Sequence, residues 1–131
     1  MSITWIATIL VIEDCLSELK LISHYLSDRG YNVIKATSAK EALEIILESK
    51  PDAIVTDVEM PGMSGFELCR FIKTNPTNQK VPIVICRSKN QAIHRLWAKK
   101  QSADAYITKP YTPEQLLSVI QSLEACSVKK N

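Results

Sequence analysis

Short apolar runs that alternate with segments of helical periodicity are the feature that most constrains the fold of this chain. The runs lie at about residues 6–12, 31–36, 52–57, 81–86 and 105–108. Apolar runs of this length are typical of strands that are buried on both faces of a parallel sheet. The segments between them place apolar side chains three and four residues apart, as helices that cover such a sheet do. The sequence therefore predicts an α/β fold.

The strict alternation of strand and helix also predicts a topology. Right-handed crossovers between parallel strands place helices on both faces of the sheet. We expect a flavodoxin-like (βα)5 doubly wound parallel sheet with strand order 2-1-3-4-5, in which the first and third strands are neighbours. With 131 residues and a hydrophobic content of 46%, the chain suits a single domain, residues 1–131, whose core spans about 6–126.

The predicted helices have recognisable ends and apolar faces. Gly30 suits the end of the first helix, and Ser38 with Glu41 forms the pattern of a capping box at the start of the second. Pro113 follows Thr112 at the start of the last helix. The side chains that we expect to face the core are, helix by helix, Leu16, Leu19, Ile22 and Leu26; Leu43, Ile46 and Leu47; Phe66, Cys69 and either Ile72 or Phe71; Ile93, Leu96 and Trp97; and Leu116, Val119, Ile120 and Leu123.

Acidic side chains follow two of the predicted strands, and a lysine ends a third. Glu13 and Asp14 come directly after the first run, Asp57 ends the third, and Lys109 ends the fifth. Chemistry in an open parallel sheet gathers at the carboxyl ends of the strands, so we expect these groups to share one crevice. Neighbouring carboxylates raise each other's pKa, and Mg²⁺, which prefers oxygen ligands, would relieve that conflict. The alternative is a salt-bridge cluster without metal, which would still hold three negative charges against one positive charge.

Composition excludes several other classes. The net charge of +2 indicates no strongly charged partner, and no apolar run is long enough to span a bilayer. The N-terminus lacks the pattern of a signal peptide. The four cysteines have no zinc-ligand spacing, and free thiols fit a reducing compartment, so we expect a cytoplasmic protein that does not bind a membrane. These cysteines are Cys15, Cys69, Cys86 and Cys126.

Three motifs contain the strand-end residues: ILVIED at 9–14, DVEMPGMSG at 57–65 and KP at 109–110. Together they closely resemble the receiver domain of two-component response regulators, the CheY-like family, over nearly the whole chain. The resemblance implies that Asp57 accepts a phosphoryl group from a histidine kinase or phosphotransfer protein. It implies that Mg²⁺ is held by Glu13, Asp14, Asp57 and the backbone carbonyl of Glu59, and that Lys109 pairs with a phosphoryl oxygen. Such a protein catalyses only its own phosphotransfer and dephosphorylation, and is not otherwise an enzyme.

Arg87 departs from the family's pattern, because receivers usually have Thr or Ser there, whose hydroxyl bonds the phosphoryl group. The planar guanidinium suits a phosphate or a carboxylate. We therefore expect Arg87 either to clamp Asp57 before phosphorylation or to bind the phosphoryl oxygens directly. Alternatively, Arg87 points to solvent and Ser88 supplies the hydroxyl. A further alternative is a degenerate receiver that docks partners without being phosphorylated.

Glu59 allows two interpretations and one further class of function. Its carboxylate either influences the water that hydrolyses the acyl phosphate or is a solvated surface charge. A Mg²⁺-dependent phosphatase that uses Asp57 and Glu59 as a catalytic pair is disfavoured, because related enzymes need a catalytic pair on the first strand and usually a cap insertion.

The second half of the chain carries the expected output residues. Tyr106 stands where such receivers have an aromatic side chain that rotates inward on activation, although a simply packed tyrosine is the alternative. The segment 87–100 is basic and includes Lys89, Arg95 and Trp97, which favours an acidic protein surface as partner. We expect a downstream protein to bind the face formed by the fourth helix, fifth strand and fifth helix. With no helix-turn-helix region and few basic residues, direct nucleic-acid binding is not expected, and the output is protein binding by a stand-alone receiver.

Overall fold

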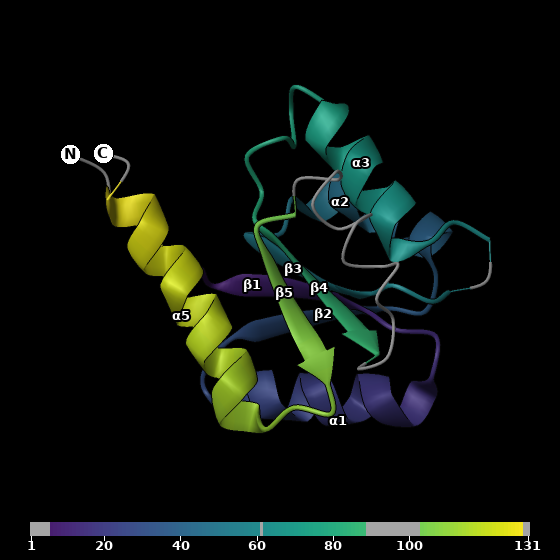
Figure 1. The fold of residues 1–131 in the computed structure, drawn as a ribbon. Coiled ribbons are helices and arrows are strands. Elements are labelled where there is room, and N and C mark those ends of the chain that lie inside the picture. Colours follow the sequence, from purple (N-terminus) through teal and green to yellow (C-terminus); the bar gives the residue numbers. More distant parts are fainter. Residues whose placement is uncertain (1–5, 61, 89–102, 130–131) are drawn as a thin grey trace.

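The computed structural model describes residues 6–60, 62–88 and 103–129, with the backbone alone for Ser88 and 125–129. The strands are β1 (Thr8–Ile12), β2 (Asn32–Ala36), β3 (Ala53–Asp57), β4 (Ile83–Ser88) and β5 (Ala105–Lys109). The helices of the described part are α1 (Leu16–Ser27), α2 (Ala39–Ser49), α3 (Gly65–Thr74) and α5 (Pro113–Lys129). The strands form one parallel sheet in the order β2-β1-β3-β4-β5, so the predicted fold class and strand order are confirmed (Figure 1).

The register of the sheet aligns the strand ends that carry the acidic and basic groups. Ile12 lies opposite Thr56, so the residues after β1 emerge beside the end of β3. At the other side of the sheet, Ser88 of β4 lies opposite Lys109 of β5. The N–H of Glu13 donates to the carbonyl oxygen of Ala36 at 3.0 Å, which extends the pairing of β1 with β2 by one residue. The carboxyl ends of the strands therefore meet at one edge.

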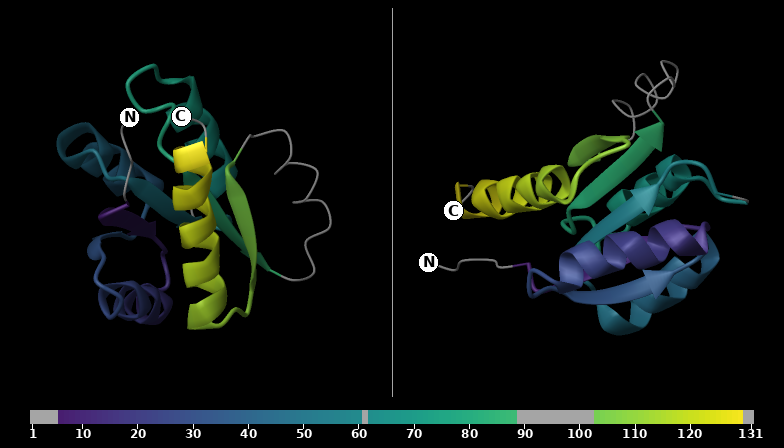
Figure 2. Two further views of the ribbon diagram at one scale, coloured as in Figure 1. Left: turned by 90° about the vertical axis from the view of Figure 1, so that its left-hand side faces the viewer. Right: turned by 90° about the horizontal axis from the view of Figure 1, so that it is seen from below.

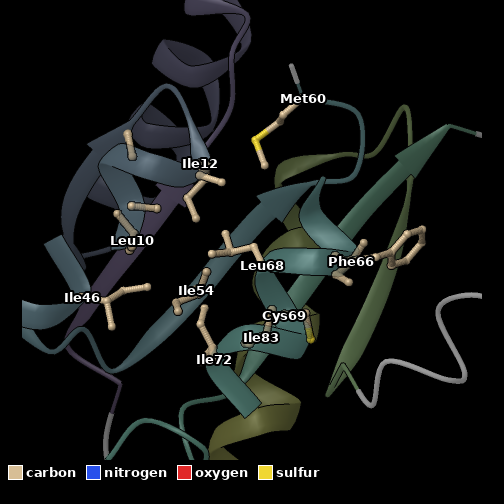
Figure 3. Close-up of a cluster of buried hydrophobic side chains, with 14 of the residues drawn as sticks. Leu10, Ile12, Ile46, Ile54, Met60, Phe66, Leu68, Cys69, Ile72 and Ile83 are labelled. Atoms are coloured by element: carbon tan, nitrogen blue, oxygen red, sulfur yellow. The ribbon is translucent and has the colours of Figure 1, made fainter. Parts of the chain in front are cut away.

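Helices cover both faces of the sheet, and a hydrophobic cluster lies beneath each pair. Figure 3 shows the cluster between the sheet and helices α2 and α3, where Leu10, Ile54 and Ile83 of the strands are fully buried. The second cluster lies under α1 and α5, which pack against each other on the opposite face (Figure 2). Successive residues of β1, β3 and β4 supply opposite clusters, so these central strands are mostly apolar, as a sheet covered on both faces requires.

Two leucine positions were predicted wrongly as inward-facing, and the alternative between Ile72 and Phe71 is resolved. Leu16 is 69% exposed, Leu47 71% and Phe71 51%. Leu16 is the first residue of α1 and lies before the helix packs on the sheet. On α2 the buried line runs through Ala42 and Ile46, so Leu47 lies outside it. On α3 the residue that packs inward is Ile72, which selects it over Phe71. The other described inward residues are buried or packed against the clusters: Leu19, Ile22, Leu26, Leu43, Ile46, Phe66, Cys69, Leu116, Val119, Ile120 and Leu123.

Some element ends differ from the prediction. The fourth strand runs from Ile83 to Ser88 rather than over 81–86, which places Arg87 inside the sheet. Ser38 Oγ accepts the N–H of Glu41, as the predicted capping box requires. The return bond differs, because the carboxylate of Glu41 accepts the N–H of Thr37 and not that of Ser38. The predicted helix with Ile93, Leu96 and Trp97 lies outside the described residues. Within the described part of the chain, no helix is long and apolar enough to cross a membrane.

Candidate functional site

Three carboxylates converge at the carboxyl edge of the sheet. Glu13, Asp14 and Asp57 each offer an oxygen, and the three oxygens lie within 4.8 Å of one another. Glu13 is buried at 2% exposure, the side chain of Asp57 is 14% exposed, and Asp14 is open to solvent. The structure therefore brings together the acidic groups that the sequence placed on two separate strand ends.

Lys109 lies at the centre of this group of acids. Its Nζ atom is 2.8 Å from Oε1 of Glu13 and 3.1 Å from Oδ1 of Asp57. A third carboxylate, that of Glu18, accepts from the same Nζ at 3.1 Å. The sequence interpretation missed Glu18, although its position in the first turn of the helix that follows β1 was a usable signal. One ammonium group thus links acids from β3, from the end of β1 and from α1.

The crowding of these charges shifts their pKa values. Burial raises the pKa of Glu13 to about 7, and the charge of Asp57 adds to the rise, although the bond from Lys109 opposes it. Burial also raises the pKa of Asp57 against the effect of Lys109. Burial alone would lower the pKa of Lys109, but its bonds to Glu13, Asp57 and Glu18 outweigh that effect and raise it. In the absence of a further cation, one lysine does not fully offset the acids.

The acids line a pocket of about 340 Å³ that opens to solvent. Its lining residues are Glu13, Asp14, Cys15, Glu18, Asp57, Val58, Glu59, Arg87 and Lys109. An all-oxygen set of carboxylates with space for water suits a hard divalent cation such as Mg²⁺, which keeps several waters when bound to protein. The residues present therefore fit the metal that the sequence predicts. Burial, with a smaller contribution from the charge of Asp57, raises the pKa of Glu13, and a bound cation would favour its ionised form.

A close contact behind Asp57 explains the glycine of the DVEMPGMSG motif. Gly65 begins α3, and its N–H donates to the carbonyl oxygen of Val58 at 3.0 Å. A Cβ atom at Gly65 would collide with the backbone carbonyl of Asp57. Ser64 and Glu67 form a reciprocal capping box, Ser64 Oγ accepting at 3.2 Å and Glu67 Oε1 at 3.3 Å. This Ser-x-x-Glu pattern, which the sequence interpretation did not use, fixes the start of α3 against the end of β3.

Arg87 contacts both the pocket and Tyr106. It lies on β4 opposite Thr108, is half-buried and lines the pocket that contains Asp57. Its guanidinium carbon is 5.2 Å from the centroid of the Tyr106 ring, which is cation–π geometry. Arg87 therefore does not simply point to solvent, which was one of the two alternatives for this residue. The side chain of Ser88 and the predicted output residues Lys89, Arg95 and Trp97 lie outside the described residues.

The chain matches the model of the response regulator receiver domain over residues 9–121. It is 31% identical over 119 residues to the protein PilH of Pseudomonas aeruginosa, covering 91% of this chain and 98% of PilH. It is also 31% identical to the phosphate regulon transcriptional regulatory protein PhoB of Pseudomonas aeruginosa, over 88% of this chain but only 51% of PhoB.

The structural comparison agrees. The chemotaxis response regulator CheY4 of Vibrio cholerae superposes with a TM-score of 0.82 at 30% identity, covering 91% of this chain and 99% of CheY4. The family match spans β1 to α5 and so includes every strand end that contributes to the acidic pocket. This chain therefore belongs to the receiver domain family of two-component response regulators.

Proposed function

We propose that this receiver is a phosphorylation switch in which the carboxylate of Asp57 accepts a phosphoryl group from a histidine kinase or a phosphotransfer protein. The observation that carries the proposal is the position of Asp57 at the end of β3, in the acidic pocket and bonded to Lys109 at 3.1 Å. A carboxylate is a competent nucleophile for forming an aspartyl phosphate. Family membership supports the same role, since the acid lies within the matched residues 9–121.

In the proposed step, an oxygen of Asp57 forms a bond to phosphorus while the bond from phosphorus to the donor's histidine nitrogen breaks. The imidazole leaves with the bonding electron pair and takes a proton from solvent. Lys109, which donates to three carboxylates before the reaction, donates to an oxygen of the transferred group. The protein contributes mainly position and charge, because phosphoryl transfer needs little covalent help.

We further propose that Mg²⁺ is held by the side chains of Glu13, Asp14 and Asp57 and by the backbone carbonyl of Glu59. The convergence of the three carboxylates supports the first three ligands, and Glu59 lines the same pocket. When bound, the ion would offset the negative charge on the transferring oxygens.

The output of the switch is binding to a downstream protein. The proposed surface includes β5 and α5 together with the predicted helix that carries Ile93, Leu96 and Trp97. Tyr106 lies on β5, next to Arg87 of β4, so a change at the pocket has a short route to this face. Nucleic acid and membrane are not partners in this proposal. Beyond phosphotransfer and dephosphorylation at Asp57, the domain catalyses no reaction.

The second candidate is a degenerate receiver that docks partners without phosphorylation. The observation that favours it is Arg87, which lines the pocket at the position where the family usually has a small hydroxyl side chain. Acetyl phosphate with Mg²⁺, followed by intact-mass measurement, separates the two. The switch requires an adduct of one phosphoryl group that Asp57→Asn abolishes. Absence of an adduct, or an adduct that survives Asp57→Asn, supports the docking module instead.

A further inference from the structure

Arg87 is shared between two environments. One is the face of the Tyr106 ring, 5.2 Å from the guanidinium carbon, and the other is the pocket that Asp57 and Lys109 line. The register explains how one side chain reaches both. Ile85 lies opposite Tyr106, and Arg87, two residues further toward the carboxyl edge, projects from the same face of β4 as Ile85. Arg87 therefore reaches the ring diagonally from the edge that carries the site.

The charge of the pocket determines which environment the guanidinium prefers. In the unmodified protein, Lys109 already bonds Glu13, Glu18 and Asp57, and Arg87 rests on the ring. A phosphoryl group on Asp57 adds new anionic oxygens beside these acids. A guanidinium fork binds such oxygens through paired charge-assisted hydrogen bonds, which are stronger than a half-exposed cation–π contact.

We propose that Arg87 is a two-position residue: it stacks on Tyr106 in the unmodified protein and moves to the phosphoryl group when Asp57 is phosphorylated. This inference rests on the proposed function, because it needs Asp57 as the acceptor. The departure of Arg87 leaves the ring without its cation, so the state of Asp57 is transmitted to β5. Linkage makes the effect reciprocal. The Tyr106 ring competes with the phosphoryl group for Arg87, so the ring reduces the stabilisation that Arg87 gives to the phosphorylated state.

The first test follows the Tyr106 ring itself. Protein labelled with ¹³C-tyrosine is titrated with beryllofluoride and Mg²⁺, which mimic the phosphorylated state, and Tyr106→Phe identifies the resonance. We expect the Tyr106 ring signal to shift in the wild-type protein and to stay in place in Arg87→Met. Arg87→Lys is the matched control, since it keeps the positive charge but loses the planar fork, and its response should be smaller than that of the wild type. A wild-type response in Arg87→Met overturns the inference.

The second test is a double-mutant cycle on beryllofluoride affinity. Removing the competing ring with Tyr106→Leu should tighten binding by about two- to fivefold when Arg87 is present, the range given by a half-exposed cation–π contact. In the Arg87→Met background the same substitution should change nothing. An equal effect of Tyr106→Leu in both backgrounds overturns the inference, because a merely structural role of the ring does not depend on Arg87. Amide spectra of β1 and α1 report whether each variant is folded.

Failure of the inference is distinguishable from failure of the proposed function. If acetyl phosphate modifies Asp57 in all variants while Tyr106 responds identically with and without Arg87, only the two-position role is wrong. If the wild-type protein takes neither beryllofluoride nor a phosphoryl group, the proposed function is wrong and the inference fails with it. In that case, a Tyr106 signal that Arg87→Met alters in the ligand-free protein shows that the stacking contact alone is correct.

Discussion

The Nζ atom of Lys109 lies 2.8 Å from Oε1 of Glu13, a carboxylate that is 2% exposed. The two residues are separated by 96 positions in the sequence and meet because β1 and β5 end at the same edge of the sheet. Glu13 therefore depends on Lys109 for its charge balance. Burial nevertheless raises the pKa of Glu13 to about 7, so Lys109 alone does not fully stabilise the ionised carboxylate in the protein without metal.

Removing the ammonium group should destabilise the metal-free protein in a pH-dependent way. In Lys109→Met, Glu13 is left buried without its cation, and we expect a loss of about 2 kcal/mol in unfolding free energy at about pH 8. The loss should be smaller near pH 5, where Glu13 is protonated. Urea unfolding in the presence of a chelator measures both. Lys73→Met is the matched control: Lys73 pairs with Asp104 at 2.7 Å, away from the pocket, and its cost should be similar at the two pH values.

The pH profile of stability should report Glu13 directly. The pKa of Glu13 in the folded protein, about 7, lies above the ordinary glutamate value of 4.5, so the stability that Glu13 contributes is full below pH 4.5 and is lost as pH rises through 7. We expect the metal-free protein to lose on the order of 2 kcal/mol between about pH 5 and pH 8. Saturating Mg²⁺ should reverse the loss. Glu13→Gln should remove most of the slope, leaving the smaller part due to Asp57, whose pKa is also raised. An unchanged slope in that variant would show that another group is responsible.

Metal affinity should depend on the same protonation. Because a carboxylate ligand must be ionised, Mg²⁺ affinity should fall by about tenfold per pH unit below the pKa of Glu13. Calorimetric titration at several pH values measures this. Asp14→Asn and Asp57→Asn should each weaken binding, whereas Glu44→Gln, on the exposed face of α2, should not. Affinity that is constant from about pH 5 to pH 8 would contradict the assignment of Glu13 as a ligand.

A methyl group at Gly65 should disturb the acceptor. The Cβ would collide with the carbonyl of Asp57, so Gly65→Ala should cost about 1–3 kcal/mol and also reduce Mg²⁺ affinity by displacing the end of β3. Gly30→Ala is the control. Gly30 has a φ of +94° with open space around its Cβ position, so the substitution should cost stability through the backbone without changing metal affinity. Equal effects of the two substitutions on metal binding would refute the role of the close contact.

The sequence predicts this fold well because the apolar runs and the alternation of strands with helices indicate the same architecture. Continuous apolar strands require helices on both faces, and alternation then leaves few topologies, so the strand order and the meeting of Glu13 with Asp57 follow from simple rules. Predictions were less reliable where a residue's environment depends on the angle at which a helix packs. Leu47 has the helical spacing of a core residue, but α2 packs through Ala42 and Ile46 and leaves Leu47 exposed.

Long-range side-chain contacts were harder to predict. The first-turn position of Glu18 places it near the strand ends, but its bond to Lys109 also depends on how α1 is positioned against β5, which the sequence does not specify. The stacking of Arg87 on Tyr106 depends on the end of β4, which was placed two residues too early. Each of these contacts joins residues that are distant in the chain and whose types permit several partners.

The location of the phosphoryl group tests the central claim most directly. After reaction with acetyl phosphate and Mg²⁺, borohydride converts an aspartyl phosphate to homoserine, and tandem mass spectrometry of the peptides identifies the modified position. The account predicts homoserine at position 57 alone, and none when Mg²⁺ is withheld with a chelator. Modification at any other acid, or no modification of the folded protein under these conditions, would contradict it.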